Sequence, residues 1–254
     1  MTEVAFLSGV TRPELLAGLH ASLCAQDVDW KWCAQLDGDA IGWEPGEADR
    51  DGWLGDPRVE LERNPKPLGS GTSRNLALIR SKGTPYVLCV DDDDLLYPGG
   101  IDTLLKTVKE QRKCLGAWGR TDVMRDATEP PDAATAEVFK SWPETGLIPP
   151  GTIGAQFQET GRFAVHVGAV LWRRTHLVAV GGYGALPRSI DTHPFISAES
   201  LFPVYYEDVP VYRYLIHPGQ MTQTAYYQEI KSRVQGHTFE RAALMRQLLE
   251  LREE

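Results

Sequence analysis

Four consecutive aspartates, Asp91 to Asp94, follow the apolar run YVLCV at 86–90 and precede the residues LLYP. Acidic residues favour the N-terminus of a helix, and a helix that begins near Pro98 would explain one or two of them. Four like charges at the end of a buried strand repel one another and resist desolvation. The pattern therefore favours a site for a divalent cation at this strand end.

Strand and helix signals alternate through the first half of the chain. Apolar runs predict strands over 4–7, 30–36, 59–63 and 85–90, and helical spacing predicts helices over 14–26, 70–82 and 101–111. Thr11 and Glu14 form a capping-box pattern before the first helix, and Leu76 and Ile79 are expected on the inner side of the second. This order predicts an α/β fold with a mostly parallel sheet flanked by helices.

Acidic residues follow two of the predicted strands, at the positions where such sheets bind ligands. Asp37 and Asp39 lie in the sequence DGD directly after 30–36, and Asp91 to Asp94 follow 85–90. DGD by itself is also an ordinary turn sequence. Because ligands bind at the carboxyl ends of the strands in such sheets, residues 1–120 are interpreted as a nucleotide-binding half.

The second half of the chain is less regular. The segment 125–161 is rich in Pro, Ala, Thr and Glu and predicts a long surface loop of the lid or binding type. A strand over 162–174, a short helix over 175–184 and an edge strand over 210–215 follow. Residues 228–254 predict an amphipathic C-terminal helix with Leu244, Leu248 and Leu251 along one side.

Composition narrows the class of protein. The 254 residues, 42% of them hydrophobic, suit one compact domain, and no apolar run reaches the ~20 residues of a membrane span. The N-terminus is not a secretory signal, so we expect a cytoplasmic protein. The net charge of −9 without a basic stripe argues against nucleic acid as a partner. The cysteines are far apart and are interpreted as reduced thiols: Cys24, Cys33, Cys89 and Cys114.

Four segments, in order, resemble the family 2 glycosyltransferases, which have the GT-A fold. They are SGVTRPELLAGLHASLCAQ at 8–26, LDGD at 36–39, the stretch 64–105, and GAVLWRRTHLVAVGGYGALPRSIDTHPF at 168–195. The resemblance covers roughly residues 4–225 and is strongest between Asn64 and Leu105. It implies a single GT-A domain over 1–254, with a nucleotide-sugar half at 1–120 and an acceptor-side half at 121–227.

The resemblance also implies roles for the aspartates. Asp91 and Asp93 occupy the two aspartate positions of the family's DxD motif, which binds a nucleoside-diphosphate sugar through Mg²⁺ or Mn²⁺. Such an ion offsets the charge of the diphosphate and stabilises its departure. Asp93 is assigned to the metal and Asp91 to the ribose or the metal. Asp92 is grouped with the donor site, with a solvated neighbour as the alternative.

His217 matches a position where related GT-A enzymes keep a histidine that contacts the metal or the diphosphate. The alternative is a turn residue, since Pro218 and Gly219 follow it. Mg²⁺ prefers oxygen ligands, whereas Mn²⁺ accepts imidazole. The other histidines have no shared spacing and are interpreted as structural or exposed: His20, His166, His176, His193 and His237.

Two further segments match nucleotide-binding positions of the family. An aspartate after the second strand accepts a hydrogen bond from the base there, and Asp37 is a better candidate than Asp39. The sequence GSGTSRN at 69–75 resembles the small-residue turn before an Arg-Asn pair, which places Arg74 or Asn75 near the nucleotide. The alternative for Arg74 is a surface position on a helix. The segment is not a P-loop, because no GK[ST] follows.

The catalytic base is where the family pattern is only partly kept. The family often has a Glu-Asp pair beyond a Gly-Gly-aromatic turn, and here the segment GGYGALPRSID places Ile190 at the usual glutamate position. Asp191 remains as the candidate that takes the proton from the acceptor hydroxyl. It is also a candidate N-cap of the helix that would begin at DTHPF.

The resemblance predicts a metal-dependent, inverting glycosyltransferase. The donor would be a UDP-, GDP- or TDP-linked sugar, and the acceptor an unidentified hydroxyl compound. Ile190 motivates one alternative, a sugar-nucleotide-binding or degenerate transferase. Sugar-phosphate nucleotidyl transfer is another, although SGVTRPE lacks the Gly-rich, Arg- and Lys-bearing loop it needs. Glycoside hydrolysis by two facing carboxylates is a third. The C-terminal helix leaves a homo-oligomer open, because it can pack on its own sheet or on a partner.

Overall fold

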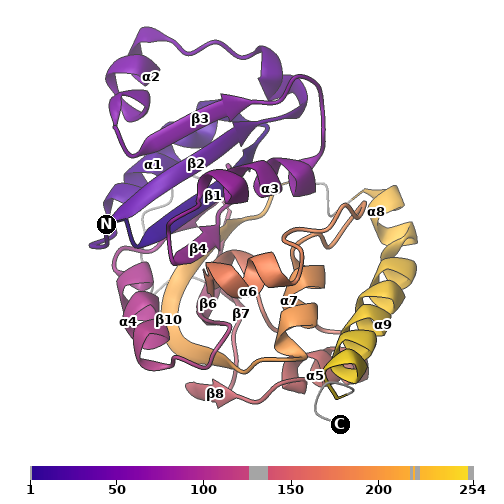
Figure 1. Ribbon diagram of the computed structural model, residues 1–254. Coiled ribbons are helices and arrows are strands. Elements are labelled where there is room, and N and C mark those ends of the chain that lie inside the picture. Colours follow the sequence, from indigo (N-terminus) through magenta and orange to yellow (C-terminus); the bar gives the residue numbers. More distant parts are fainter. Residues whose placement is uncertain (1, 126–136, 218–219, 221–223, 251–254) are drawn as a thin grey trace.

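A computed structural model describes residues 2–125, 137–217, 220 and 224–250 (Figure 1). Its strands are β1 (Val4–Val10), β2 (Trp30–Leu36), β3 (Val59–Arg63), β4 (Tyr86–Cys89), β5 (Leu95–Leu96), β6 (Gly116–Met124), β7 (Glu137–Lys140), β8 (Gly146–Ile148), β9 (Val170–Arg173) and β10 (Val204–Leu215). The α-helices are α1 (Leu16–Cys24), α2 (Glu47–Asp51), α3 (Ser70–Arg80), α4 (Gly100–Glu110), α5 (Thr152–Thr160), α6 (Arg174–Ala179), α7 (Thr192–Glu199), α8 (Ala225–Glu229) and α9 (Lys231–Glu250). Short 3-10 helices are η1 (Pro13–Leu15), η2 (Gly38–Gly42), η3 (Trp53–Gly55) and η4 (Val167–Ala169).

One sheet runs through the described chain in the order β3-β2-β1-β4-β9-β6-β10-β5. The first four strands are parallel, β9 is antiparallel to both of its neighbours, and β10 is parallel to β6. Helices cover the sheet, as Figure 1 shows for α3 and α4. The predicted α/β class is therefore confirmed, and the carboxyl ends of β1, β2 and β4 lie at one edge, where such sheets bind ligands.

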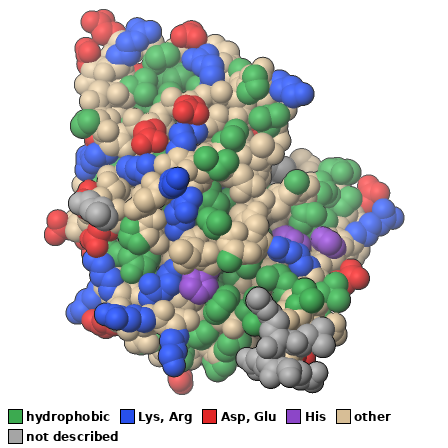
Figure 2. Space-filling model, viewed as in Figure 1, with side chains coloured by type: hydrophobic (Ala, Val, Ile, Leu, Met, Phe, Trp, Pro, Cys, Tyr) green, Lys and Arg blue, Asp and Glu red, His purple; other side chains and the backbone are tan. Residues whose placement is uncertain are grey.

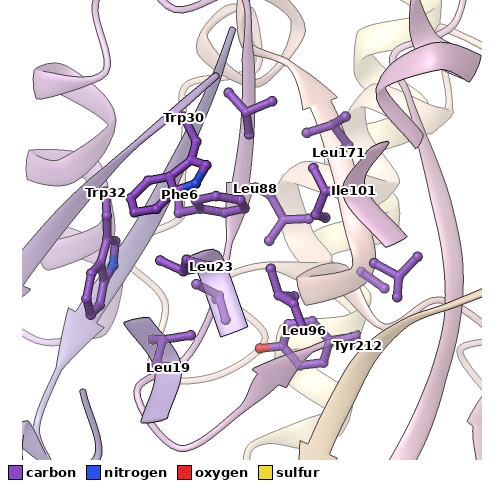
Figure 3. Packing of buried hydrophobic residues seen from close by; sticks show 14 of the residues in the cluster. Phe6, Leu19, Leu23, Trp30, Trp32, Leu88, Leu96, Ile101, Leu171 and Tyr212 are labelled. Carbon is purple, nitrogen blue, oxygen red and sulfur yellow. The ribbon is translucent and has the colours of Figure 1, made fainter. Parts of the chain in front are cut away.

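The strands form because their sequences are nearly continuous apolar runs, as expected where a sheet is covered on both faces. Phe6 of β1, Leu88 of β4 and Leu171 of β9 pack in one buried cluster with Ile101 of α4 (Figure 3). Full burial of a side chain of this size contributes about 1.5–3 kcal/mol. This cluster holds the strands, and therefore their ends, in fixed positions.

α3 packs with a side other than the predicted one. Ile79, expected inside, is 66% exposed, whereas Ala77 and Leu78 are buried. The reason is the short distance between the helix and β1, because a Cβ atom on Gly9 would lie 3.3 Å from the Cβ of Ser73. Small side chains permit this approach, so the side of the helix with small residues faces the sheet.

α9 also packs differently from the prediction. It stands beside α7 (Figure 1) and buries Val234, Thr238 and Ala242, whereas Leu244 and Leu248 are 52% and 63% exposed. Leu251 lies outside the described residues. Hydrophobic side chains reach the surface in this part of the molecule (Figure 2). The smaller side chains form the packed side, and the leucine side remains uncovered.

Two predictions for the second half were wrong in detail. β10 is not an edge strand, because it pairs with β6, β5 and β8. The described part of the expected loop 125–161 contains β7, β8 and α5, while 126–136 lies outside the described residues. β7 pairs with the preceding strand β6, and β8 pairs with β10, about 60 residues further along the chain. Local periodicity does not reveal such pairings.

Two further features concern the state of the cysteines and the character of the helices. All four cysteines are free, and Cys24 is the exposed one. Among the residues that the structure describes, no helix combines the length and the apolar character needed to cross a membrane.

Candidate active site

A cavity of about 500 Å³ opens where the ends of β1 and β4 meet. Thr11 and Arg12 line it after β1, and Asp91 and Asp93 line it after β4. The other lining residues are Ser70, Arg74, Leu186, Pro187, Arg188, Ser189, Ile190, Asp191, Tyr214, His217, Gln220 and Tyr227. The structure thus brings together five predicted site residues: Arg74, Asp91, Asp93, Asp191 and His217.

Asp92 holds the turn after β1 and does not line the cavity. Its Oδ2 accepts hydrogen bonds from the amides of Thr11 at 2.5 Å and Arg12 at 2.8 Å, and its Oδ1 from Arg12 Nη2 at 2.6 Å. Because Asp92 is buried, the alternative of a solvated neighbour is wrong, and its hydrogen bonds give it a structural role beside the predicted donor site. Thr11 is no helix cap, since its hydroxyl also contacts Asp92 at 3.2 Å and η1 lacks a side-chain cap.

Asp94 is the second aspartate with a structural role. Its Oδ2 accepts a hydrogen bond from the Tyr212 hydroxyl and its Oδ1 from the Leu215 amide, both at 2.8 Å. Burial raises the pKa of this carboxyl well above its ordinary value. Asp92 and Asp94 therefore tie the turn after β4 to β1 and to β10, which leaves Asp91 and Asp93 on the cavity.

Asp93, His217 and Arg12 meet at one point. Asp93 Oδ2 lies 3.1 Å from His217 Nε2. Arg12 Nη1 lies 2.5 Å from that oxygen and 2.8 Å from that nitrogen. Burial and the charge of Asp91 raise the pKa of Asp93, although Arg12 opposes this. The carboxylate therefore lies where more positive charge would stabilise it.

The two donor atoms fit one divalent ion. Adjacent ligands of an octahedral ion at about 2.1 Å are about 3 Å apart, which matches the separation of Asp93 Oδ2 and His217 Nε2. A carboxylate oxygen together with an imidazole nitrogen suits Mn²⁺ better than Mg²⁺. Arg12 Nη1 contacts both atoms, so its guanidinium and an ion would compete for them.

Asp91 pairs with Arg74. The guanidinium of Arg74 donates to Asp91 Oδ1, and its Nη1 lies 4.0 Å from Asp191 Oδ2. Desolvation raises the pKa of Asp91, but Arg74 outweighs it and holds the pKa below its ordinary value. Arg74 is buried on the side of α3 that faces the sheet. The alternative of a surface arginine is therefore wrong.

Asp37 and Asp39 lie outside this cavity. Asp37 Oδ1 accepts hydrogen bonds from the Leu68 amide at 2.8 Å and from Asn64 Nδ2 at 3.0 Å. Burial raises its pKa, but these hydrogen bonds hold it below its ordinary value. Asp39 is exposed in η2. The backbone amide of Asp37 donates a hydrogen bond to the carbonyl of Val10, at the end of β1. Asp37 therefore lies next to the turn that carries Thr11.

Asn75 holds the glycine turn after α6. Its Nδ2 donates to the Tyr183 carbonyl at 2.8 Å, and its Oδ1 accepts from the Tyr183 amide at 2.9 Å. Gly182 has a φ of 70°, and a Cβ atom there would collide with Asn75 Oδ1. Both ends of the Asn75 amide therefore bind the backbone, and of the predicted pair Arg74 and Asn75 it is Arg74 that lines the cavity.

Asp191 stands at the N-terminus of α7 with 37% of its side chain exposed. Its Oδ1 accepts a hydrogen bond from the Thr192 amide at 2.7 Å. Within the described part of the chain, its Oδ2 has no hydrogen-bond partner, and Arg74 Nη1 lies 4.0 Å from it. A capping role and a role as base are therefore compatible, because they use different oxygens.

Sequence reasoning missed two residues that line the cavity, Arg12 and Arg188. Arg12 lies two residues after the end of β1, at the carboxyl edge of the sheet, and that position is the signal that could have found it. Arg188 is buried, with its guanidinium 3.8 Å from the centre of the Tyr227 ring. His166 lies outside the cavity and packs on Tyr212, as expected for a structural histidine. Burial lowers its pKa to about 4, although nearby carboxylates oppose this.

A separate group of potential metal ligands lies where α1 meets the residue after η3. His20 Nε2 is 2.9 Å from Asp56 Oδ2 and 3.5 Å from Cys24 Sγ. It is the one close trio of metal-type ligands found within the described ranges. Arg58 Nη2 donates to Asp56 at 2.6 Å and contacts Cys24 at 3.4 Å. The guanidinium of Arg58 therefore already binds two of the three potential ligands.

Comparison with solved structures identifies the fold. S. aureus TarS in complex with UDP-GlcNAc gives a TM-score of 0.66 at 14% identity, covering 91% of this chain and 64% of that one. A TarS structure in complex with UDP gives 0.66 at 14% identity, with 85% and 61% covered. Another TarS structure gives 0.64 at 14% identity, with 85% and 37% covered. The GT-A prediction is confirmed by these matches, while the chain spans less than two thirds of each TarS chain.

Comparison of the sequence identifies the family. No curated protein matches the chain. Residues 15–178 match the family model described as glycosyl transferase family 2. That range includes the turn with Asp91 and Asp93, the strand β4 before it, and the helix α3 that carries Arg74. Because the match extends over more than half of the sequence, the chain belongs to glycosyl transferase family 2.

Proposed function

We propose that this protein is a metal-dependent, inverting glycosyltransferase that uses a nucleoside-diphosphate sugar. The observation that carries the proposal is the convergence of Asp91, Asp93 and His217 in one cavity with Asp191. Carboxylates beside a diphosphate are repelled unless a cation lies between them. Asp93 and His217 would hold Mn²⁺ or Mg²⁺, which would offset the charge of the departing diphosphate.

The proposed donor lies along the carboxyl edge of the sheet. Asp91 would accept hydrogen bonds from the ribose, and Asp37 from the base. The two TarS complexes, with UDP and with UDP-GlcNAc, support a uridine nucleotide as the first to test. Residues 1–120 would form the donor half of one domain, and 121–227 its acceptor half.

Asp191 is the proposed base. Asp191 lines the cavity, and its Oδ2 would take the proton from the acceptor hydroxyl as the oxygen attacks the anomeric carbon. The new bond forms as the bond to the diphosphate breaks, on the opposite face of the sugar, so the anomeric configuration inverts. One carboxylate suffices for this route, because no covalent sugar intermediate needs to form.

Ile190 favours one alternative, a protein that binds the donor but transfers sugar poorly. It lines the cavity at the usual position of the family's glutamate. A hydrocarbon side chain cannot accept a proton, so catalysis would depend on Asp191 alone. The two functions differ in whether transfer that depends on Asp191 is measurable.

Calorimetric titration tests the donor site first. UDP, GDP and TDP are titrated into the protein with Mn²⁺ and again with EDTA. We expect one nucleotide to bind at least about tenfold more tightly with Mn²⁺, and Asp93→Asn to abolish the difference. Asp51→Asn, at an exposed position of α2, is the control and retains it. Equal binding with Mn²⁺ and EDTA would show that the site needs no metal.

The stereochemistry is tested once a donor is known. NMR of the first product formed gives its anomeric configuration. A product with the configuration opposite to that of the donor supports inversion. The same configuration in donor and product would contradict it.

A further inference from the structure

A second cavity of about 570 Å³ adjoins the first. Arg188, Ser189 and Tyr227 line both. The second cavity extends from this shared wall to β7, α5 and α9. A molecule bound in it would therefore reach the wall of the proposed donor site, close to Asp191.

Positive side chains surround this second cavity. Lys140, Arg162, Arg188 and Lys231 line it, and none of its lining residues is Asp or Glu. The protein as a whole carries a net charge of −9, so the cavity is opposite in sign to the molecule. Four cations around one cavity attract an anion strongly, because its walls are less polarisable than water.

These cations are not neutralised by the side chains that the structure describes. Among those side chains, which do not include that of Glu137, no carboxylate lies within 4.0 Å of Lys140, Arg162 or Lys231. The Lys140 ammonium donates instead to the Phe163 carbonyl, and Arg188 donates to the Tyr227 carbonyl. Burial lowers the pKa of Lys140, and the nearby charge of Lys231 lowers it further. An anion bound between the two lysines would relieve this repulsion.

Aromatic rings lie beside the positive charges. Phe139, Phe157 and Phe163 line the same cavity. Lys140 Nζ is 5.1 Å from the centre of the Phe139 ring and 6.0 Å from that of Phe163. Rings beside cations suit a ligand that has both an anionic group and a ring to stack, such as an acidic sugar.

The wall between the cavities is conformationally strained. Ser189 has a φ of 54°, which makes it the one residue other than glycine with positive φ in the described segments. Such a conformation costs of order 1–3 kcal/mol and persists where the surroundings impose it. Its position between Arg188 and Ile190 places the strain where the two cavities meet.

From these observations we propose that the second cavity binds the acceptor, and that the acceptor is an anionic sugar or polyol whose phosphate or carboxylate lies between Lys140 and Lys231. The proposal rests on the proposed function for the role of acceptor. The anion would be held by the cations while a hydroxyl of the same molecule extends along Ser189 towards Asp191. The cations would select an acceptor by its anionic group, and the carboxylate of Asp191 would activate the acceptor hydroxyl.

The test compares three probes that share one ring. Glucose 6-phosphate, glucuronate and glucose are titrated into the full chain by calorimetry in low-salt buffer. We expect one or both acidic sugars to bind about tenfold or more tightly than glucose. Tighter binding of glucose 6-phosphate assigns a phosphate, and tighter binding of glucuronate assigns a carboxylate. Equal binding of all three probes would overturn the proposal.

Variants locate the binding. Lys231→Gln, at an exposed position, and Lys140→Gln each weaken binding of the acidic sugar about threefold to tenfold. Arg233→Gln, an exposed position on the same helix that does not line the cavity, retains wild-type binding. Wild-type affinity in both lysine variants would place the anion elsewhere.

UDP titration separates this proposal from the proposed function. If the wild-type protein binds acidic sugars in the cavity but no nucleotide, the anion site stands and its role as acceptor site is overturned. If UDP binds and the acidic sugars do not, the donor site stands and the anionic acceptor is overturned.

Discussion

Asp93 and His217 share a cation that the chain itself supplies. Arg12 Nη1 contacts both ligand atoms, and Arg12 Nη2 contacts Asp92. The guanidinium therefore stabilises buried carboxylates that would otherwise repel one another. At the residue scale, the occupancy of the proposed metal site becomes a competition between this guanidinium and a divalent ion.

Removal of that guanidinium should favour the ion. Arg12→Gln leaves Asp93 without its positive partner, so we expect Mn²⁺ to bind the nucleotide-free protein about tenfold more tightly. Titration of Mn²⁺ followed by EPR measures this affinity. Arg50→Gln, at an exposed position of α2, is the control and leaves it unchanged. Unchanged affinity in Arg12→Gln would show that the two cations do not compete.

Asp191 can be tested without loss of its capping role. Asparagine caps a helix about as well as aspartate but cannot take a proton. Asp191→Asn is therefore expected to fold like the wild type and to transfer sugar 10²- to 10⁴-fold more slowly, the usual contribution of a general base. Steady-state transfer rates measure the effect. Transfer at the wild-type rate would remove Asp191 from the reaction.

At the scale of elements, α3 connects the sheet edge to the glycine turn after α6. Arg74 on this helix pairs with Asp91, and Asn75 holds the backbone of Tyr183. One helix thus positions groups from both halves of the cavity. A change at its contacts should affect folding and the geometry of the site together.

Asn75→Ala removes two hydrogen bonds and leaves a buried backbone amide and carbonyl without them. We expect the free energy of unfolding to fall by about 1–3 kcal/mol, the cost of leaving such groups unpaired. Urea unfolding measures it. Ile79→Ala, at the exposed position of the same helix, should change stability by less than about 0.5 kcal/mol. Equal losses in the two variants would contradict the role of Asn75.

The contact between α7 and α9 predicts a dependence on pH. His193 is buried there, and burial, with Arg241 and His237 nearby, lowers its pKa to about 4 from an ordinary value of 6.5. Its neutral form is thus favoured by folding, so its contribution is complete above pH 6.5 and is lost as the pH falls towards 4.

The unfolding temperature at pH 7.5 and at pH 5.0 tests this prediction. His193→Gln should show a smaller fall than the wild type, because it has no imidazole to protonate. His166, whose pKa burial also lowers to about 4, is unchanged in both proteins. An equal fall in wild type and variant would exclude His193 as a cause.

At the scale of the whole molecule, β9 joins the two halves of the sheet. It lies between β4 of the first half and β6, and it is antiparallel to both. A Cβ atom on Gly116 of β6 would collide with the carbonyl of Leu171 in β9 and lie 3.1 Å from the Cα of Trp172. The close approach of these two strands therefore requires glycine.

Gly116→Ala should destabilise the protein by about 1–3 kcal/mol, as overpacking does. Gly18→Ala is the matched control, because Gly18 lies on the exposed side of α1 with no atom within 4 Å of an added Cβ. There alanine should stabilise by about 0.5–1 kcal/mol, since glycine is a poor helix former. Thermal unfolding compares the two. A Gly116→Ala protein as stable as the wild type would show that β9 and β6 can move apart at little cost.

The sequence by itself determined the α/β class, the strands β1 to β4 and the strand end that carries Asp91 and Asp93. These features depend on apolar runs and on charged residues that are adjacent in the chain, so the sequence predicts them without knowledge of distant contacts. It also identified Arg74, Asp191 and His217, which the structure places in one cavity. It did not identify Arg12 at the site, nor the structural roles of Asp92 and Asn75.

Tertiary structure decided the rest, because those features depend on partners far apart in sequence. Asp92 is of a residue type that often binds metal ions, but its carboxylate accepts hydrogen bonds from the amides of Thr11 and Arg12, 81 and 80 positions away in the sequence. The packed sides of α3 and α9 depend on how closely a neighbour approaches, which hydrophobic spacing does not contain. The charges of the positive cavity come from β7, the residues after α5, the segment before α7, and α9, and they adjoin one another only after folding.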